Sequence, residues 1–370
     1  MRCYSLINII LYVGARITLL SPVAVVHGFN LPAKAKVVKP VSGFAASIKQ
    51  SSEAYLHAKV ESNVPFRLNA WPLNRDPKAM SSDYPLIGGR VSITTACTFF
   101  TWWAQSRYTN VMASSALTLI CSMCFDKRLG QAAFCGTFAG MGSHTLISSW
   151  QIALGLGGLT SILFECLIHN KNMFSGIGGR LGATAFIASS CIAVMAKIPT
   201  GVTTFSLFSN HIQASTLLFM AFWHGLGSVA TIVLREVSDD SSAADPVRAS
   251  ATVGLIGALF LENKTAALAL YGGSFVGMSL PSRLMFGILP GKATGRSNQK
   301  STKLSVLTSF AIAGAIGGII HGAAIDLGWW PGGWGGKAGL FAFIGCLVYR
   351  GLAKIAISLN STNQRELATE

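Results

Sequence analysis

The sequence predicts an all-α polytopic membrane protein with about ten transmembrane segments, arranged as an inverted 5+5 internal repeat. Three observations support this fold class. Hydrophobic residues make up 51% of the 370 residues and charged residues only 12%, about half the charged share of a typical soluble domain. Uncharged runs close to the length of a membrane-spanning helix recur along the chain. A glycine-rich phrase and the sequence around it occur twice. A large soluble core, the competing interpretation, does not explain runs of this length.

The N-terminal segment is predicted to be a targeting sequence that does not belong to the folded domain. Residues 1–28 have a basic start, an apolar stretch and small residues near their end, as in a secretory signal peptide. Residues 29–80 are rich in Ala, Ser and Lys and poor in acids, as in a transit peptide. With Phe29 at the junction, this order resembles the bipartite plastid presequences of algae with secondary plastids. The resemblance implies a plastid membrane. An ordinary signal or an additional N-terminal span would instead imply an endomembrane or the plasma membrane.

The repeated phrase defines the first block of an internal alignment. "CGTFAGM" ends at Met141 and "GGSFVGM" ends at Met278. At this offset of 137 residues, 113–141 align with 250–278 without a gap. The alignment also pairs Phe134 with Tyr271 and Lys127 with Lys264.

A second block shows that the duplication extends further. Residues 176–198 align with 333–355 at an offset of 157, with ten of 23 positions identical. Two independent blocks in the same order indicate an internal duplication. The predicted organisation is a first repeat at 86–200, a connector at 201–213, a second repeat at 214–357 and a polar tail at 358–370.

Each repeat contains five apolar segments. They lie near 86–105, 111–125, 130–144, 148–168 and 180–198 in the first repeat, and near 214–235, 248–261, 266–280, 304–324 and 337–357 in the second. The second and third segments of each set are short, because 14 or 15 helical residues rise only about 21–23 Å against a hydrocarbon core of roughly 30 Å. They are either short tilted spans or half-helices that meet inside the protein.

Loop charges predict how the repeats insert. When the chain is threaded through ten crossings, eleven of the Lys and Arg residues between 106 and 338 fall on one side and four on the other, the kind of asymmetry that orients membrane proteins. The aligned Lys127 and Lys264 fall on opposite sides, because each repeat has an odd number of segments. The repeats are therefore expected to insert upside-down relative to one another, as in many secondary transporters.

The paired phrases are the candidate solute pathway. Inverted-repeat transporters bind solutes near the midplane, at short or glycine-interrupted helices in corresponding positions. Phe138 and Phe275 are expected to form an aromatic constriction with methionines as its walls. The alternative is that the Gly-x-x-x-Gly spacing only packs helices. The candidate pathway residues are Gly136, Thr137, Phe138, Gly140, Met141, Ser143, His144, Gly273, Ser274, Phe275, Gly277, Met278, Ser279 and Pro281.

Ionisable residues in or near the spans are secondary candidates, because each is costly in a membrane unless it is paired or hydrated. His224 and His321 lie in glycine-rich spans, either as satisfied interior residues or as contacts for a proton or solute. Two further pairs, Glu165 before Arg180 and Asp326 before Lys337, flank corresponding turns and are expected to form interfacial ion pairs rather than to bind the solute.

No enzyme is predicted, because the chain has no protease, hydrolase, phosphate-loop or paired-acid motif. No catalytic residue, cofactor or metal site is expected; Cys121 and Cys124 form a C-x-x-C without a second pair. Much of the excess positive charge behind the net charge of +15 lies in the N-terminal segment. No soluble basic domain that could bind nucleic acid is visible in the sequence.

The expected function is a membrane transporter or channel for a small solute, an anion or a small neutral molecule being slightly favoured. The alternative is a non-transporting scaffold or assembly factor for other membrane proteins, and an intramembrane enzyme is a distant third. Membrane lipids and the solute are the expected partners, and homo-oligomerisation is left open.

Overall fold

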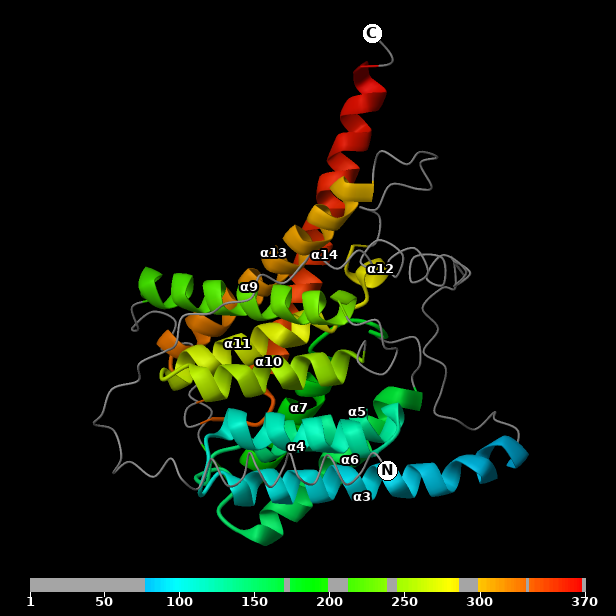
Figure 1. The fold of residues 1–370 in the computed structure, drawn as a ribbon, viewed down its shortest axis with the longest axis vertical. Helices are drawn as coiled ribbons and strands as arrows, with labels where there is room; N and C mark the ends of the chain where they lie inside the picture. The colour runs from blue at the N-terminus through cyan, green and yellow to red at the C-terminus, as the bar shows by residue number, and fades with distance from the viewer. Residues whose placement is uncertain are drawn as a thin grey trace, which may run out of the picture. The chain divides into compact units, whose positions relative to one another are not determined.

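The computed structural model describes residues 77–169, 174–198, 212–237, 245–285, 299–330 and 333–367. Within these ranges every regular element is an α-helix, which confirms the predicted helical class (Figure 1). The signal-like segment, almost all of the transit-like segment and most of the connector at 201–213 lie outside the described residues. Predictions about them stay predictions.

Two sets of five helices follow one another along the chain. The first set is α3 (Pro77–Ala104), α4 (Asn110–Cys124), α5 (Lys127–Gly140), α6 (Trp150–His169) and α7 (Arg180–Met195). The second set is α9 (Ala214–Val237), α10 (Pro246–Phe260), α11 (Lys264–Gly277), α13 (Gln299–Asp326) and α14 (Lys337–Leu367), with the short α12 (Pro281–Leu284) after α11. The ten helices coincide in order with the ten expected segments. Three are clearly longer than expected, since α3 begins at Pro77, α13 begins at Gln299 and α14 continues through most of the predicted tail.

Capping residues separate the short helices in each set. Asp126 ends the link between α4 and α5, where its carboxylate accepts a hydrogen bond of 2.8 Å from the backbone N–H of Leu129. Asn263, which aligns with Asp126, caps α11 by accepting from the N–H groups of Thr265 and Ala266. A side-chain oxygen at this position satisfies N–H groups that the first turn leaves unpaired. The same local signal therefore starts both short helices.

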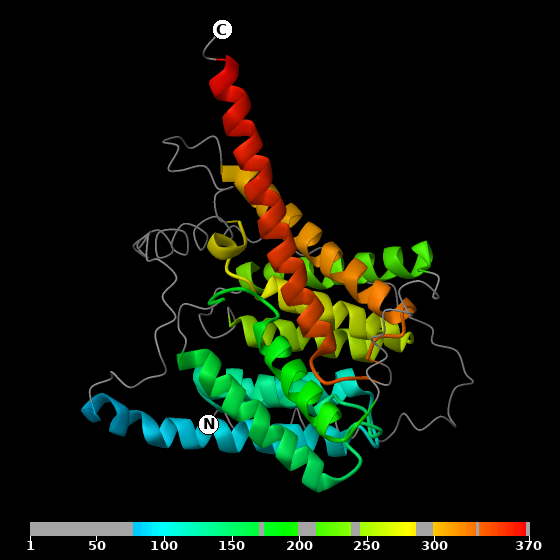
Figure 2. The same cartoon turned by 180° about the vertical axis from the view of Figure 1, so that it is seen from behind.

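The two sets contain the same helix contacts. In the first set, α3 packs against α5 and α6, and α4 packs against α5; in the second, α9 packs against α11 and α13, and α10 packs against α11. Between the sets, α4 packs against α10 and α7 packs against α14. Figure 2 shows α7 and α14 side by side.

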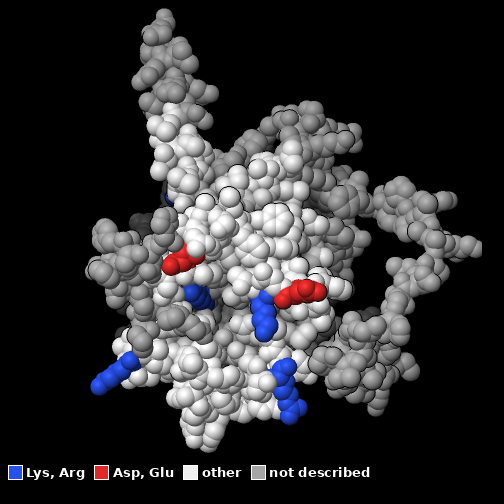
Figure 3. Space-filling view, turned by 90° about the vertical axis from the view of Figure 1, so that its left-hand side faces the viewer, with Lys and Arg blue, Asp and Glu red and all other residues white. Residues whose placement is uncertain are grey.

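Helix α9 buries several polar side chains and exposes large apolar ones. On α9, His224, Ser228 and Thr231 are buried, whereas Leu218 is 70% exposed and Phe222 61% exposed. A helix on the surface of a soluble protein has the opposite pattern. On the face drawn in Figure 3, charged side chains are few among the described residues, and one basic and one acidic side chain lie against each other. Such a surface is suited to lipid.

Four helices are long and apolar enough to cross a membrane. The spans are Trp150–Ile168, Ala214–Arg235, Leu304–Asp326 and Lys337–Leu359. The helices α4, α7 and α10 are apolar but shorter. The described part of the chain is thus compatible with an integral membrane protein, as the composition predicts.

Candidate functional site

The two repeated phrases end the short helices α5 and α11 and bring four aromatic rings together. The ring centroids of Phe138 and Phe275 are 4.5 Å apart. Phe134 and Tyr271, one helical turn earlier, complete the cluster, with Phe138 to Tyr271 at 5.7 Å and Phe134 to Phe275 at 5.9 Å. All four side chains are buried. The cluster therefore joins the two sets of helices through two pairs of residues that align in the internal repeat.

Sequence reasoning about the site missed Phe134 and Tyr271. Their alignment with each other was visible, and four residues separate each of them from the phenylalanine of its phrase. Residues four apart lie on the same face of a helix. That spacing was the signal that could have found them.

The glycines of the phrases act in helix packing and do not line the cavity described below. A Cβ atom at Gly136 would collide with the backbone carbonyl of Thr94, and one at Gly273 would collide with that of His224. Gly140 and Gly277 are as closely packed, against the backbones of α3 and α9. The packing interpretation of the Gly-x-x-x-Gly spacing thus accounts for these four residues. They let α5 lie directly on α3, and α11 directly on α9.

The hydroxyl groups of the phrases bind neighbouring short helices. The Thr137 hydroxyl lies 2.8 Å from that of Thr118 on α4, and the Ser274 hydroxyl lies 2.6 Å from that of Ser250 on α10. Their role in this structure is to hold each pair of short helices together.

The turns before α7 and α14 each bind the residues that follow the phrase of the other set. The N–H of Ser143 donates to the carbonyl of Gly333, and the N–H of Leu280 donates to that of Gly176, both at 2.8 Å. Gly176 and Gly333, which align in the repeat, have φ of 76° and 84°, a conformation that favours glycine. The aligned pairs of residues thus make reciprocal backbone contacts.

The remaining pathway candidates lie near these turns, away from the cavity lining. His144 is exposed and stacks edge-on against Trp102 at 5.5 Å. Ser279 accepts a hydrogen bond from the N–H of Gly178. Pro281 begins α12, and Met278 packs at the margin of the main hydrophobic core.

A small cavity adjoins the aromatic cluster. Its volume is about 50 Å³, enough for a few water-sized atoms. The short helices contribute Phe138, Met141, Tyr271 and Phe275 to its walls. The first turn of α14 and one residue of α13 contribute Lys337 and His321. Five of the residues singled out from the sequence, with Tyr271 added, therefore surround one internal space.

The two histidines bind one another. Nε2 of His224 lies 3.1 Å from Nδ1 of His321, and the ring of His321 stacks on Phe341 with centroids 5.0 Å apart. His224 is fully buried, and its Nδ1 has no hydrogen-bond partner within the described structure. One nitrogen of the pair donates and the other accepts, so the two tautomers of the pair are coupled.

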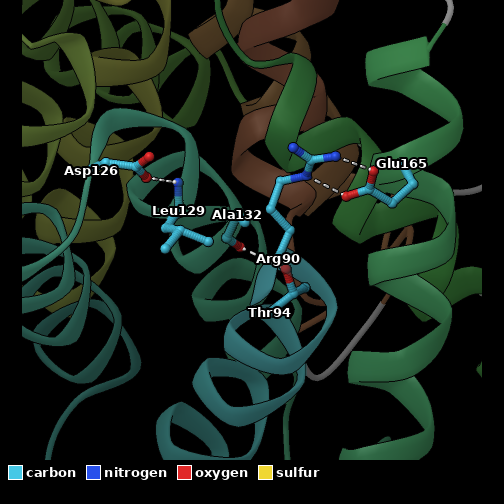
Figure 4. A network of polar contacts seen from close by, with 6 residues as sticks. All are labelled: Arg90, Thr94, Asp126, Leu129, Ala132 and Glu165. Carbon is cyan, nitrogen blue, oxygen red and sulfur yellow. Dashed lines mark hydrogen bonds and ion pairs between the residues drawn. The ribbon is translucent and has the colours of Figure 1, made fainter. Parts of the chain in front are cut away.

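Of the two expected ion pairs, the one between Asp326 and Lys337 does not form, and the one between Glu165 and Arg180 stays a prediction. Arg90 binds Glu165 with two hydrogen bonds of 2.6 Å (Figure 4). Asp326 accepts instead from the backbone N–H of Gln213, at 2.8 Å. The sequence reasoning did not anticipate Arg90, which reaches Glu165 from α3 because the packing of α3 on α6 places them together.

Lys337 bonds only to backbone oxygen within the described structure. Its Nζ donates to the carbonyls of Trp329 at 2.7 Å and Trp330 at 3.4 Å. Its charge thus faces carbonyl dipoles at the edge of the cavity.

The described residues contain no cluster of three or more His, Cys, Asp or Glu residues that could hold a metal ion. No protein-family model, curated protein or solved structure matches this chain.

Proposed function

We propose that the protein is an integral membrane transporter or channel for a small solute, with its pathway between two inverted repeats at the paired Gly-x-Phe-x-Gly-Met phrases. The observation that carries the proposal is the cavity beside the four clustered rings. Its walls come from both sets of helices, as expected for a solute site at the interface of two repeats.

The inverted repeat is supported by the contacts between the sets. A two-fold axis brings equivalent elements together, and α4 packs on α10 while α7 packs on α14. The reciprocal bonds from Ser143 and Leu280 obey the same relation. With an odd number of crossings in each repeat, equivalent helices would run in opposite directions through the bilayer.

The aromatic cluster would act as the gate of the pathway. Phe138 and Phe275 pack against each other at the centre of the cluster, so they would close such a path on that side of the cavity. A transporter needs a space that opens to each side in turn, and rotation of one repeat against the other would separate the rings. A scaffold, the alternative function, requires no internal space at this position.

Solute flux into proteoliposomes tests the proposal. Purified protein would be assayed against anions, cations and small neutral solutes. The variant Phe138→Trp/Phe275→Trp enlarges both gate rings and is expected to block a flux that the unmodified protein supports. Phe100→Trp/Phe222→Trp is the matched control, because both of its positions are exposed on the apolar surface. If the gate variant is folded and carries the solute as fast as the control, the pathway lies elsewhere.

A further inference from the structure

The chemistry of the cavity identifies a class of solute. We infer that the cavity binds a small monovalent anion, such as a halide or nitrate, and that Lys337 anchors it. The inference rests on the proposed function, since the anion is the solute that the protein would carry. It follows from three properties of the cavity: charge, helix geometry and size.

The cavity has a positive charge without an acidic partner. Lys337 lines it, and the described lining contains no Asp or Glu. Within the described structure, the partners of Lys337 are the backbone carbonyls of Trp329 and Trp330. A buried ammonium group is costly without an opposite charge. A monovalent anion in the cavity would supply that charge, whereas a cation would be repelled.

Helix α14 presents its positive end to the same space. Lys337, Ala338 and Gly339 of its first turn line the cavity. The first N–H groups of a helix lack intrahelical partners and attract anions. The start of α7 packs against this turn, where Gly182 faces Gly339 so closely that neither has room for a Cβ atom. Two helix N-termini therefore meet beside the lysine.

Size and the remaining walls restrict the anion to a small one with little hydration. A volume of about 50 Å³ favours a small anion over phosphorylated metabolites and larger carboxylates. Phe138, Tyr271 and Phe275 offer ring edges and apolar surface, and the edge of an aromatic ring is its positive part. His321 contributes a polar group, with its Nδ1 bonded to His224. One lysine matches one negative charge.

Binding of radioactive iodide to the purified full chain tests the anion site without requiring transport. Saturable binding that chloride displaces is expected. Lys337→Met removes the charge, keeps a similar side-chain length and should weaken binding at least about tenfold. Lys264→Met is the matched control, because Lys264 likewise begins a helix but is exposed. It should bind as the unmodified protein does. Iodide binding that is absent, or equal in both variants, would overturn the inference.

A second variant covers the case in which Lys337→Met does not fold, as judged by gel filtration and circular dichroism. Leu268→Phe retains the lysine and fills part of the cavity, since Leu268 lines it, and it should also weaken iodide binding. Undiminished binding in this variant would place the iodide outside the cavity.

Flux measurements separate this inference from the proposed function. A neutral solute that crosses through the gate, without iodide binding, would overturn the anion site and leave transport standing. Iodide binding that depends on Lys337, without flux of any solute, would support the site and count against transport.

Discussion

The contact between the first and fourth helices differs between the two sets. In the first set, α3 and α6 are joined by the ion pair of Arg90 and Glu165. In the second, α9 and α13 are joined by His224 and His321. The glycine contacts show that Thr94 holds on α3 the place that His224 holds on α9. By the offset of the second sequence block, Phe164 corresponds to His321.

This difference explains why the cavity adjoins the second set. Phe164 is buried in a cluster with Ala132 and Cys135, and Leu181 packs against them. Its counterpart His321 lines the cavity with Lys337. Equivalent helices thus support a packed site in the first set and a cavity lined by His321 and Lys337 in the second. The helix arrangement depends on glycine contacts and caps that both sets share. The side chains at the cavity can therefore differ from their counterparts in the first set without changing that arrangement.

The largest expected effect comes from breaking the ion pair of the first set. Glu165→Leu leaves the buried Arg90 without its carboxylate and is expected to lower the free energy of unfolding by about 3–5 kcal/mol. Arg90→Met/Glu165→Leu removes both charges and should recover most of this loss. Thermal unfolding in detergent, followed by circular dichroism, measures both. A double variant as unstable as the single one would show that the ion pair is not the cause.

Alanine substitutions at the glycines of the repeated phrases test whether α5 packs on α3 as closely as α11 packs on α9. Gly136→Ala and Gly273→Ala each place a methyl group against a backbone carbonyl, and each should cost about 1–3 kcal/mol of stability. Gly158→Ala is the control, because its new Cβ would meet nothing within 4 Å. It should be neutral or slightly stabilising. Equal thermal midpoints for all three variants would argue against close helix packing at the phrases.

Replacing His224 and His321 by the residues at the corresponding positions of the first set tests what the two histidines contribute. His321→Phe removes the partner of the buried Nε2 of His224 and should cost about 1–3 kcal/mol. His224→Thr/His321→Phe installs the residues of the first set at both positions and should regain stability but not iodide binding. Thermal unfolding and iodide binding are measured together. Full iodide binding in the double variant would mean that the histidines are unnecessary for the site.

The smallest expected effect concerns the aligned caps. Asp126→Ala and Asn263→Ala each remove the side-chain acceptor at the start of a short helix, so each should lower stability by about 1 kcal/mol. Similar losses are expected because the caps are equivalent, and chemical unfolding of each variant measures them. A cost confined to one variant would indicate that the other helix start is held by tertiary packing alone.

Much of the fold is predictable from the sequence because its signals are local. The apolar runs mark the helices, and the residues that interrupt them mark their ends: Asp126 and Asn263 cap the short helices. Gly179 and Gly336, with positive φ, precede α7 and α14. The site is only partly predictable. The sequence indicates Phe138, Phe275, His321 and Lys337, but not that Thr137 and Ser274 face the neighbouring short helices.

By itself, the sequence determines the helical class, the order of the ten helices and the residues that align between the sets, because hydrophobic runs, caps and repeats are properties of neighbouring residues. The tertiary structure alone decides that Arg90 binds Glu165, that the two histidines meet and that the cavity opens beside Lys337. The physical reason is that these contacts depend on how each helix is rotated. In a chain this apolar, few helices carry a sequence pattern that fixes their rotation, so close packing at the glycines sets it.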